Sequence, residues 1–319
     1  MTYKDTQPPF GTSSEAALPS GQQLEIQRGA LHAVVTEVGA GLRSFSVGGQ
    51  ELLDTYGPHE MARDGRGQVL LPWPGRLEGG QYSFAGTRYQ TPLTEPETRN
   101  AIHGLTRWLN WHVIRHEASC VVMELTLHAQ PGYPFVLWLQ ERYMLTGQGL
   151  EVQTTAHNRG GTSLPYGVGH HPYFTVGTNV VNDAILMVPA RSYFRRDEHL
   201  IPVRPPVSVA GTPFDFRVPH PIGELALDTS YTDLIFNDGW AHVTLSAPSG
   251  QPGITVSLDS AHPVLQVYSG DTLTGLARRR GLAIEPYTCA PNAFNNGAGL
   301  RTLRSGESFS STWRVAVSV

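Results

Sequence analysis

The stretch Cys120–Ala129, CVVMELTLHA, decides the fold class. Apolar side chains recur at every second residue, with Val121, Met123, Leu125 and Leu127 on one face. A period of two is that of a β-strand with one buried face, because successive side chains point to opposite sides of a sheet. The segment therefore predicts a half-buried antiparallel strand.

The same alternation returns elsewhere along the chain. It is clear in LEVQTTAHN (150–158), HVTLSA (242–247), ITVSLD (254–259) and ESFSSTWRVAVSV (307–319). The longer apolar run VLWLQERYML (136–145) predicts a strand that is covered on both faces. No apolar stripe at helical spacing continues over more than about three turns. The expected class is all-β, a large antiparallel β-sandwich.

Composition indicates many turns around a buried core. The 319 residues include 34 Gly and 24 Pro, spread between the apolar segments, and such frequent interruption excludes helical bundles and collagen-like chains. Hydrophobic residues make up 40% and charged residues 16%, a balance typical of a globular chain. We expect a flexible arm over residues 1–23 and a single β-sandwich catalytic domain over 24–319. The Pro-rich segment 195–221 predicts a long connection over the surface.

Charge and cysteine content narrow the cellular environment and the partners. The formal net charge of −4 argues against nucleic acid or an anionic membrane as partner. Cys120 and Cys289 are the only cysteines, and two cysteines so far apart in sequence suit a reducing cytosol better than a disulfide framework. The first residues lack a basic-then-apolar signal pattern, and no run of about 18 apolar residues occurs. The sequence predicts a cytoplasmic protein without a membrane span.

Three loop-rich segments combine ionisable side chains with Gly and Pro. LLPWPGRLEGG and NAIHGL carry Arg76 and His103, GVGHHPYF carries His170 and His171, and GLAIEPYTCAPNAFN carries Glu285. Glu285 is expected at the end of a buried strand, either as a salt-bridged carboxylate or as a general base. The adjacent histidines point to opposite faces of a strand and cannot ligate one metal together, so we expect no metal site. One of them is either a hydrogen-bonded core residue or a general acid.

Taken one at a time, these residues do not define a function, but their order along the chain does. Six residues follow one another, each in its own short motif: Arg76, His103, His171, Asp233, Gln266 and Glu285. The motifs are GRLEGGQYSFAGTRYQ with NAIHG, HPYF, YTDLIF, LQVYSGDTLTG and AIEPYTCAPNAFN, before the ending LRSGESFSSTW. In this order they resemble the aldose 1-epimerase (galactose mutarotase) family, from about residue 30 to the C-terminus.

The resemblance implies a galactose mutarotase-like supersandwich and a cofactor-independent isomerase that interconverts the α and β anomers of a free aldose. It assigns Glu285 as the base and His171 as the acid of ring opening and closure. It also implies a set of sugar-binding residues: Arg76, His103, Asp233 and Gln266. Ordinary pKa values of about 4.3 for Glu and 6.5 for His predict a carboxylate and an imidazolium near pH 5–6, a window that their attraction widens upward. The expected partner is a small aldose, and the expected assembly is a monomer or a homodimer.

Departures from the family pattern mark a divergent subgroup. Gly75 stands where the family has Asn before the Arg, and Leu105 stands where a second Gly is common. One side-chain amide contact to the sugar is therefore expected to be missing or replaced, and galactose is not assumed as the substrate. Three aromatic residues are candidates for an apolar floor under the sugar, or for the core: Trp73, Tyr173 and Phe174.

Three alternative functions stay open at this stage. The first is a non-catalytic sugar-binding protein on the same fold, which would not need the acid–base pair. The second is a glycoside-processing enzyme that uses Asp233 and Glu285 as its two carboxylates. The third is a mutarotase for phosphorylated hexoses, for which the arginines at 278–280 supply cations.

Overall fold

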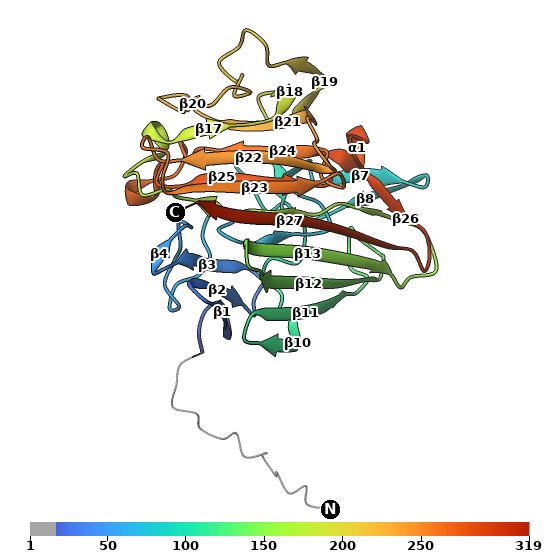
Figure 1. Ribbon diagram of the computed structural model, residues 1–319. Coiled ribbons are helices and arrows are strands. Elements are labelled where there is room, and N and C mark those ends of the chain that lie inside the picture. Colours follow the sequence, from blue (N-terminus) through green and yellow to red (C-terminus); the bar gives the residue numbers. More distant parts are fainter. Residues whose placement is uncertain (1–16, 319) are drawn as a thin grey trace, which may run out of the picture.

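Two large antiparallel sheets form most of this computed structural model, which describes residues 17–318 (Figure 1). The first sheet has nine strands, in the order β10 (His112–Glu117), β11 (Cys120–Leu127), β12 (Leu137–Leu145), β13 (Gly149–Asn158), β27 (Ser308–Ser318), β23 (Gly253–Asp259), β22 (Trp240–Ser246), β17 (Ile185–Met187) and β20 (His220–Pro221). The second has eight, in the order β19 (Pro202–Ser208), β18 (Ala190–Arg196), β21 (Asp228–Leu234), β24 (Val264–Tyr268), β25 (Leu282–Tyr287), β15 (Gly169–His170) and β5 (Val69–Leu70), with β16 (Tyr173–Phe174) paired to β25.

Alternating side chains from both sheets make one hydrophobic core. Leu139 and Val152 from the nine-stranded sheet and Val267 and Ile284 from the eight-stranded sheet belong to the same buried cluster. The two sheets therefore pack as a β-sandwich, as the sequence predicts.

The strand β12 differs from its prediction. Residues at odd positions from 137 to 145 are buried and those between them are half-buried, so one face of the strand is partly open to solvent rather than covered on both sides. The buried face includes a charged residue, Glu141, which is 0% exposed. A buried ionisable group requires a polar partner. His170 is that partner, because its Nε2 contacts Oε1 of Glu141.

The segment 195–221 is also different from its prediction. It is not one long connection, because it contains β19 and β20, which are the edge strands of the two large sheets. Pro202, Pro205 and Pro206 lie in β19. An edge strand tolerates proline because the missing N–H leaves no unpaired partner inside the sheet.

The predicted arm, residues 1–23, lies mostly outside the described residues. Of the part that is described, Ser20 and Gln22 accept backbone hydrogen bonds from Val38 and Glu37, and β1 begins at Gln23. These last residues are therefore attached to the fold, which shortens the predicted arm. No helix within residues 17–318 is long and apolar enough to span a membrane.

Smaller sheets and short helices complete the described part of the chain (Figure 1). The small strands are β1 (Gln23–Arg28), β2 (Leu31–Thr36), β3 (Leu42–Val47) and β4 (Gln50–Glu51) in one sheet, and the pairs β6 (Arg76–Glu78) with β9 (Asn100–Ile102), β7 (Gln81–Phe84) with β8 (Thr87–Gln90), and β14 (Leu164–Tyr166) with β26 (Arg301–Leu303). The helices are α1 (Ala293–Asn296), η1 (Val181–Asp183) and η2 (Gly275–Ala277).

Candidate active site

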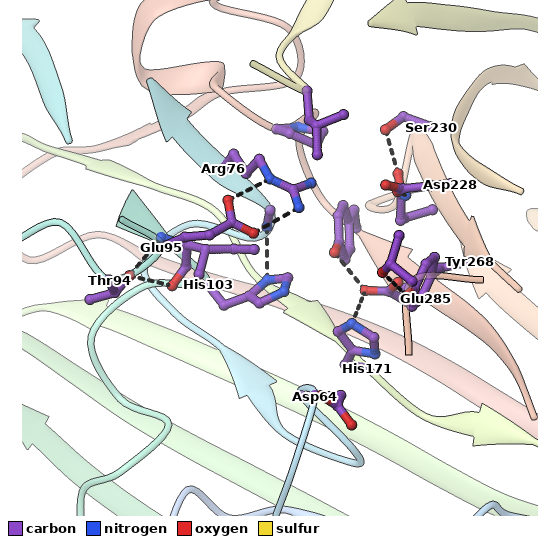
Figure 2. Close-up of a pocket in the computed structure, with 18 of the residues that line it drawn as sticks. Asp64, Arg76, Thr94, Glu95, His103, His171, Asp228, Ser230, Tyr268 and Glu285 are labelled. Carbon is purple, nitrogen blue, oxygen red and sulfur yellow. Dashed lines mark hydrogen bonds and ion pairs between the residues drawn. The ribbon is translucent and has the colours of Figure 1, made fainter. Parts of the chain in front are cut away.

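A cavity of about 350 Å³ lies between the eight-stranded sheet and the loops that adjoin β6, β9 and β15. Five of the six predicted site residues line it: Arg76, His103, His171, Gln266 and Glu285. In Figure 2, Arg76, Glu95 and His103 lie on one side of the pocket, Asp228, Ser230 and Tyr268 lie on the other, and His171 points toward Glu285. Residues more than 200 positions apart in the chain thus meet at one site.

The sheet register carries one row of polar side chains across the pocket wall. Ser230 on β21 is opposite Gln266 on β24, and Gln266 is opposite Glu285 on β25. Along β25, Glu285 and Tyr287 line the cavity, whereas Ile284 belongs to the hydrophobic core. The period of two in this strand is what exposes a carboxylate to the cavity from within a buried strand.

Glu285 is 1% exposed, and within residues 17–318 protein contacts occupy one of its two oxygens. Its Oε2 accepts a hydrogen bond of 2.6 Å from the Tyr287 hydroxyl, and it lies 3.4 Å from Nε2 of His171. The Oε1 atom accepts no hydrogen bond from any side chain or backbone group of residues 17–318. One carboxylate oxygen is therefore free to meet a ligand.

His171 is held between two rings and a tight backbone loop. Its ring stacks on Tyr173 with centroids 4.9 Å apart and meets the edge of His103 at 5.2 Å. Gly65, with φ of +77°, closes the space, because a Cβ there would lie 2.8 Å from Cδ2 of His171. The imidazole therefore has little freedom to rotate away from Glu285.

The proton affinities of the pair differ from the sequence-based prediction. Burial, helped by the positive charges of Arg107 and Arg66, lowers the pKa of His171 to about 3. Burial also raises the pKa of Glu285 well above its ordinary value, although the Tyr287 hydrogen bond acts in the opposite direction. The loss of hydration thus outweighs the mutual attraction that was expected to widen an ion-pair window. Burial therefore favours the neutral form of the pair.

Arg76 and His103 are brought together by the short ladder between β6 and β9. Arg76 is opposite Ile102, and the His103 N–H donates to the Gly75 carbonyl at 2.9 Å. The Gly75 N–H in turn donates to Nδ1 of His103 at 3.2 Å, so the neutral ring carries its proton on Nε2. His103 adopts φ of +63°, a conformation that is costly for a residue with a side chain and that is typical of functional sites.

The position of the missing family Asn has a steric explanation. Gly75 has φ of +64°, and a Cβ there would lie 2.7 Å from the Pro291 ring. Any side chain at this position would therefore clash with the Pro291 ring unless that ring moved. Gln266 is the one carboxamide among the described residues that line the cavity.

The structure places Asp233 outside the cavity, which corrects its predicted place in a sugar site. Asp233 is exposed, and Asp228 of the same strand lines the cavity instead. Five residues along a strand are about 16 Å, and an odd number of steps also reverses the face. Asp228 accepts a 2.6 Å hydrogen bond from Nε2 of Gln266 and pairs with Arg196. Asp233 and Glu285 consequently do not form a two-carboxylate site.

Other candidates also have different places from those expected. Trp73 is buried edge-on against Phe294, and Phe174 lies in the core, so Tyr173 alone of the three aromatic candidates lines the cavity. The arginines at 278–280 do not line it. Arg279 and Arg280 instead pair with Asp271 and Asp54. Within residues 17–318, no group of three or more His, Cys, Asp or Glu side chains could hold a metal ion.

Several pocket residues were missed by the sequence reasoning. Tyr287 could have been found, since it lies two residues after Glu285 and a strand repeats its face every second residue. Arg107 follows His103 by four residues in the same loop, but nothing local marks it. Glu95 is a bidentate partner of Arg76, with contacts of 2.7 and 2.8 Å, and only the tertiary fold joins these two residues.

The two-sheet antiparallel sandwich is a galactose mutarotase-like fold, as the solved structures that match it show. The GalM/aldose epimerase homologue from C. elegans matches it with a TM-score of 0.82 at 20% identity, over 93% of this chain and 98% of the other. That likeness concerns the fold alone.

Sequence comparison identifies the family. A sequence model of the aldose 1-epimerase family matches residues 22–316. YihR, an uncharacterized protein of Escherichia coli (strain K12), is 37% identical over 90% of this chain and 91% of its own length. Human galactose mutarotase is 24% identical over 69% of this chain and 66% of its own length. The chain belongs to the aldose 1-epimerase family, as its ordered motifs indicate.

Proposed function

We propose that this protein is an aldose 1-epimerase, which interconverts the α and β anomers of an aldose in the cavity at Glu285. The observation that carries the proposal is the buried contact between Glu285 and His171, in which one carboxylate oxygen stays free. Anomer exchange requires one group that takes a proton and one that gives a proton, held on the same substrate. The family membership of the chain supports the same reaction.

Ring opening moves two protons and breaks one bond. Glu285 takes the proton of the C1 hydroxyl, the bond between C1 and the ring oxygen breaks as C1 becomes an aldehyde, and His171 gives a proton to the ring oxygen. Rotation about the C1–C2 bond presents the other face of the aldehyde, and the same transfers in reverse close the ring. The residues return to their initial state, so the reaction consumes no other reactant.

Burial of the pair favours the state that ring opening produces. Before the step the pair is a carboxylate and an imidazolium, and after it the pair is a neutral carboxylic acid and a neutral imidazole. The raised pKa of Glu285 and the lowered pKa of His171 both stabilise the second arrangement. Because burial favours the neutral pair, the carboxylate–imidazolium form has to be established with the cyclic sugar bound, and ring opening returns the pair to its neutral form.

The remaining polar residues would bind the sugar hydroxyls. His103 offers its Nε2 hydrogen, Arg76 offers those guanidinium hydrogens that Glu95 does not use, and Gln266 and Asp228 form the opposite wall. Asp228 takes the carboxylate role that the family motif suggested for Asp233. The cytoplasmic location and the monomeric or homodimeric state stay predictions.

Polarimetry and anomeric proton NMR on freshly dissolved glucose, galactose, xylose and arabinose test the proposal. The wild-type protein should speed anomer exchange above the buffer rate for at least one sugar. The Glu285→Gln variant should lose about 10²–10⁴-fold of that turnover, the usual contribution of general acid–base catalysis. Glu117→Gln is the matched control, because this exposed carboxylate pairs with Arg115 and lies outside the cavity.

Two outcomes would contradict the proposal. Near-normal exchange by the Glu285→Gln protein would remove Glu285 from the reaction. Tight sugar binding by calorimetry without any acceleration by the wild-type protein would instead indicate the non-catalytic sugar-binding alternative.

A further inference from the structure

Three arginines line the cavity, and one of them has no acidic partner among the residues that the structure describes. Arg76 forms a bidentate pair with Glu95, and Arg196 pairs with Asp228. Arg107 is the third, and none of the ion pairs within residues 17–318 includes it.

The contacts of Arg107 are all with neutral groups. Its Nη1 donates to Oε1 of Gln68 at 3.2 Å, and its Nη2 donates to the Ile102 carbonyl at 3.4 Å. The Glu95 carboxylate favours the charged form of Arg107, but both oxygens of Glu95 already accept hydrogen bonds from Arg76. The guanidinium therefore keeps donor capacity that the protein does not use, since five N–H groups are present.

Burial in the cavity wall disfavours the charged form of Arg107. Burial lowers the pKa of Arg107, whereas at Arg76 the hydrogen bonds and charge of Glu95 outweigh burial and raise the pKa. The charge of Arg107 also lowers the pKa of His171 and of His103, which shows that it acts on the interior of the pocket. A half-buried charge without a counter-ion costs stability, and such charges are typical of ligand-binding sites.

We infer that the preferred substrate is an aldose that carries an oxyanion substituent, such as a carboxylate or a phosphate, and that Arg107 is its anchor. This inference rests on the proposed function. Arg107 follows His103 in one loop and contacts the carbonyl that precedes it, so the anion lies on the His103 side of the pocket, across from Asp228 and Ser230 (Figure 2). A planar guanidinium suits oxyanions because it can donate two parallel hydrogen bonds.

The assignment replaces the cations that the sequence suggested for a phosphorylated sugar. Arg279 is buried and held by Asp271 and by the Gly223 and Leu225 carbonyls, and Arg280 is paired with Asp54. Neither lines the cavity. A sugar anion therefore meets Arg107 rather than the arginine triplet.

The test compares anomer exchange of acidic and neutral sugars, each corrected for its own rate in buffer. Glucuronate and galacturonate provide the carboxylate arm, glucose 6-phosphate and galactose 6-phosphate the phosphate arm, and glucose and galactose the neutral reference. We expect wild-type kcat/KM for one acidic arm to exceed the neutral reference about tenfold or more. Arg107→Gln should reduce that ratio about tenfold or more, and Arg107→Lys should restore part of it, as expected for charge-assisted hydrogen bonds.

The matched control is Arg278→Gln, which removes the same charge from an exposed side chain outside the cavity and should leave the ratio unchanged. Equal kcat/KM for acidic and neutral sugars in the wild-type protein would overturn the inference while the proposed function stands. The same holds if Arg107→Gln and Arg278→Gln give the same ratio.

A binding measurement separates failure of the inference from failure of the proposed function. If no sugar is interconverted, the proposed function fails, and calorimetry on the Glu285→Gln protein still decides about Arg107. Tighter binding of an acidic sugar than of its neutral counterpart, lost when Arg107→Gln is added, would support the anchor. Equal binding of both sugars would reject it.

Discussion

Two neighbouring histidines each face a buried glutamate, and the two pairs differ in how fully the carboxylate is occupied. In the core, Glu141 uses both oxygens: Oε1 contacts Nε2 of His170 at 2.8 Å, and Oε2 accepts from the Thr154 hydroxyl at 2.7 Å. In the pocket, Glu285 receives contacts from residues 17–318 on Oε2 only.

The two pairs also differ in their access to a ligand. Glu141 and the His170 side chain are 0% and 3% exposed, so their pair is sealed between the two sheets. Glu285 and His171 are almost as buried but line a cavity. Burial alone therefore does not distinguish the two pairs. The pair that we propose to react differs in having a carboxylate oxygen that no group of residues 17–318 occupies, beside space for a ligand.

The largest expected effect is the difference in stability between two variants, in which Glu141 or Glu285 is replaced by Gln. Glu141→Gln should lower the free energy of unfolding by about 3 kcal/mol, because it leaves a buried donor facing an amide N–H. Glu285→Gln should leave the unfolding free energy at pH 7 unchanged or higher, since the raised pKa of Glu285 shows that its charge is disfavoured by burial. Urea unfolding followed by circular dichroism measures both.

Folded Glu141→Gln protein should retain anomer exchange, whereas Glu285→Gln should lose it. Glu117→Gln serves again as the exposed control and should stay within about 0.5 kcal/mol of the wild type. A Glu141→Gln protein as stable as this control would contradict a structural role for the Glu141–His170 pair.

The pH dependence of stability tests the shifted pKa values of the Glu285–His171 pair. The pKa of His171 is lowered to about 3 in the folded protein. Below pH 6.5 the unfolded chain takes up a proton there that the folded protein refuses, so stability falls as pH drops, by about 1.4 kcal/mol per unit for one group. Glu285, with its raised pKa, acts in the opposite direction: its contribution is present at low pH and is lost as pH rises.

Thermal unfolding between pH 4 and 7 separates these two contributions. His171→Gln should flatten the loss of stability toward acid, while Glu285→Gln should steepen it, because each variant removes one of the opposing groups. Parallel profiles for the three proteins would show that the pair has ordinary proton affinities.

The smallest expected effect concerns two carboxylates of strand β21. Asp228 lines the cavity, whereas Asp233 is exposed outside it. Asp228→Asn should weaken sugar binding about tenfold, because it removes the charge that Arg196 and Gln266 contact at the cavity wall. Asp233→Asn should change stability by less than about 0.5 kcal/mol and leave binding unaltered. Asn also tolerates the φ of +53° at this position. Calorimetric titration would reveal the reverse order if the family motif had marked the right residue.

Much of the fold followed from local periodicity. In the strand Gly149–Asn158, Leu150, Val152, Thr154 and Ala156 alternate with half-buried polar residues. All four are buried, as the period of two predicts. The opposite orientation of His170 and His171 also followed from strand geometry. The proline-rich segment was misjudged because edge pairing depends on a neighbouring strand, which proline content does not report.

The site was predictable where a motif and a strand face agree, as at Glu285. It was not predictable where the choice depended on distance along a strand or on a partner far away in sequence. Asp228 and Arg107 are such cases, since neither has a local mark.

The sequence by itself determined an all-β chain, the face that each alternating residue takes, and five of the six motif residues that meet at one pocket, because side-chain period and short motifs are local properties. The tertiary structure alone decided which glutamate each histidine meets, which aspartate reaches the cavity, and that the pocket pair prefers its neutral form. These outcomes depend on burial and on contacts between distant strands, and both exist only after the two sheets have packed.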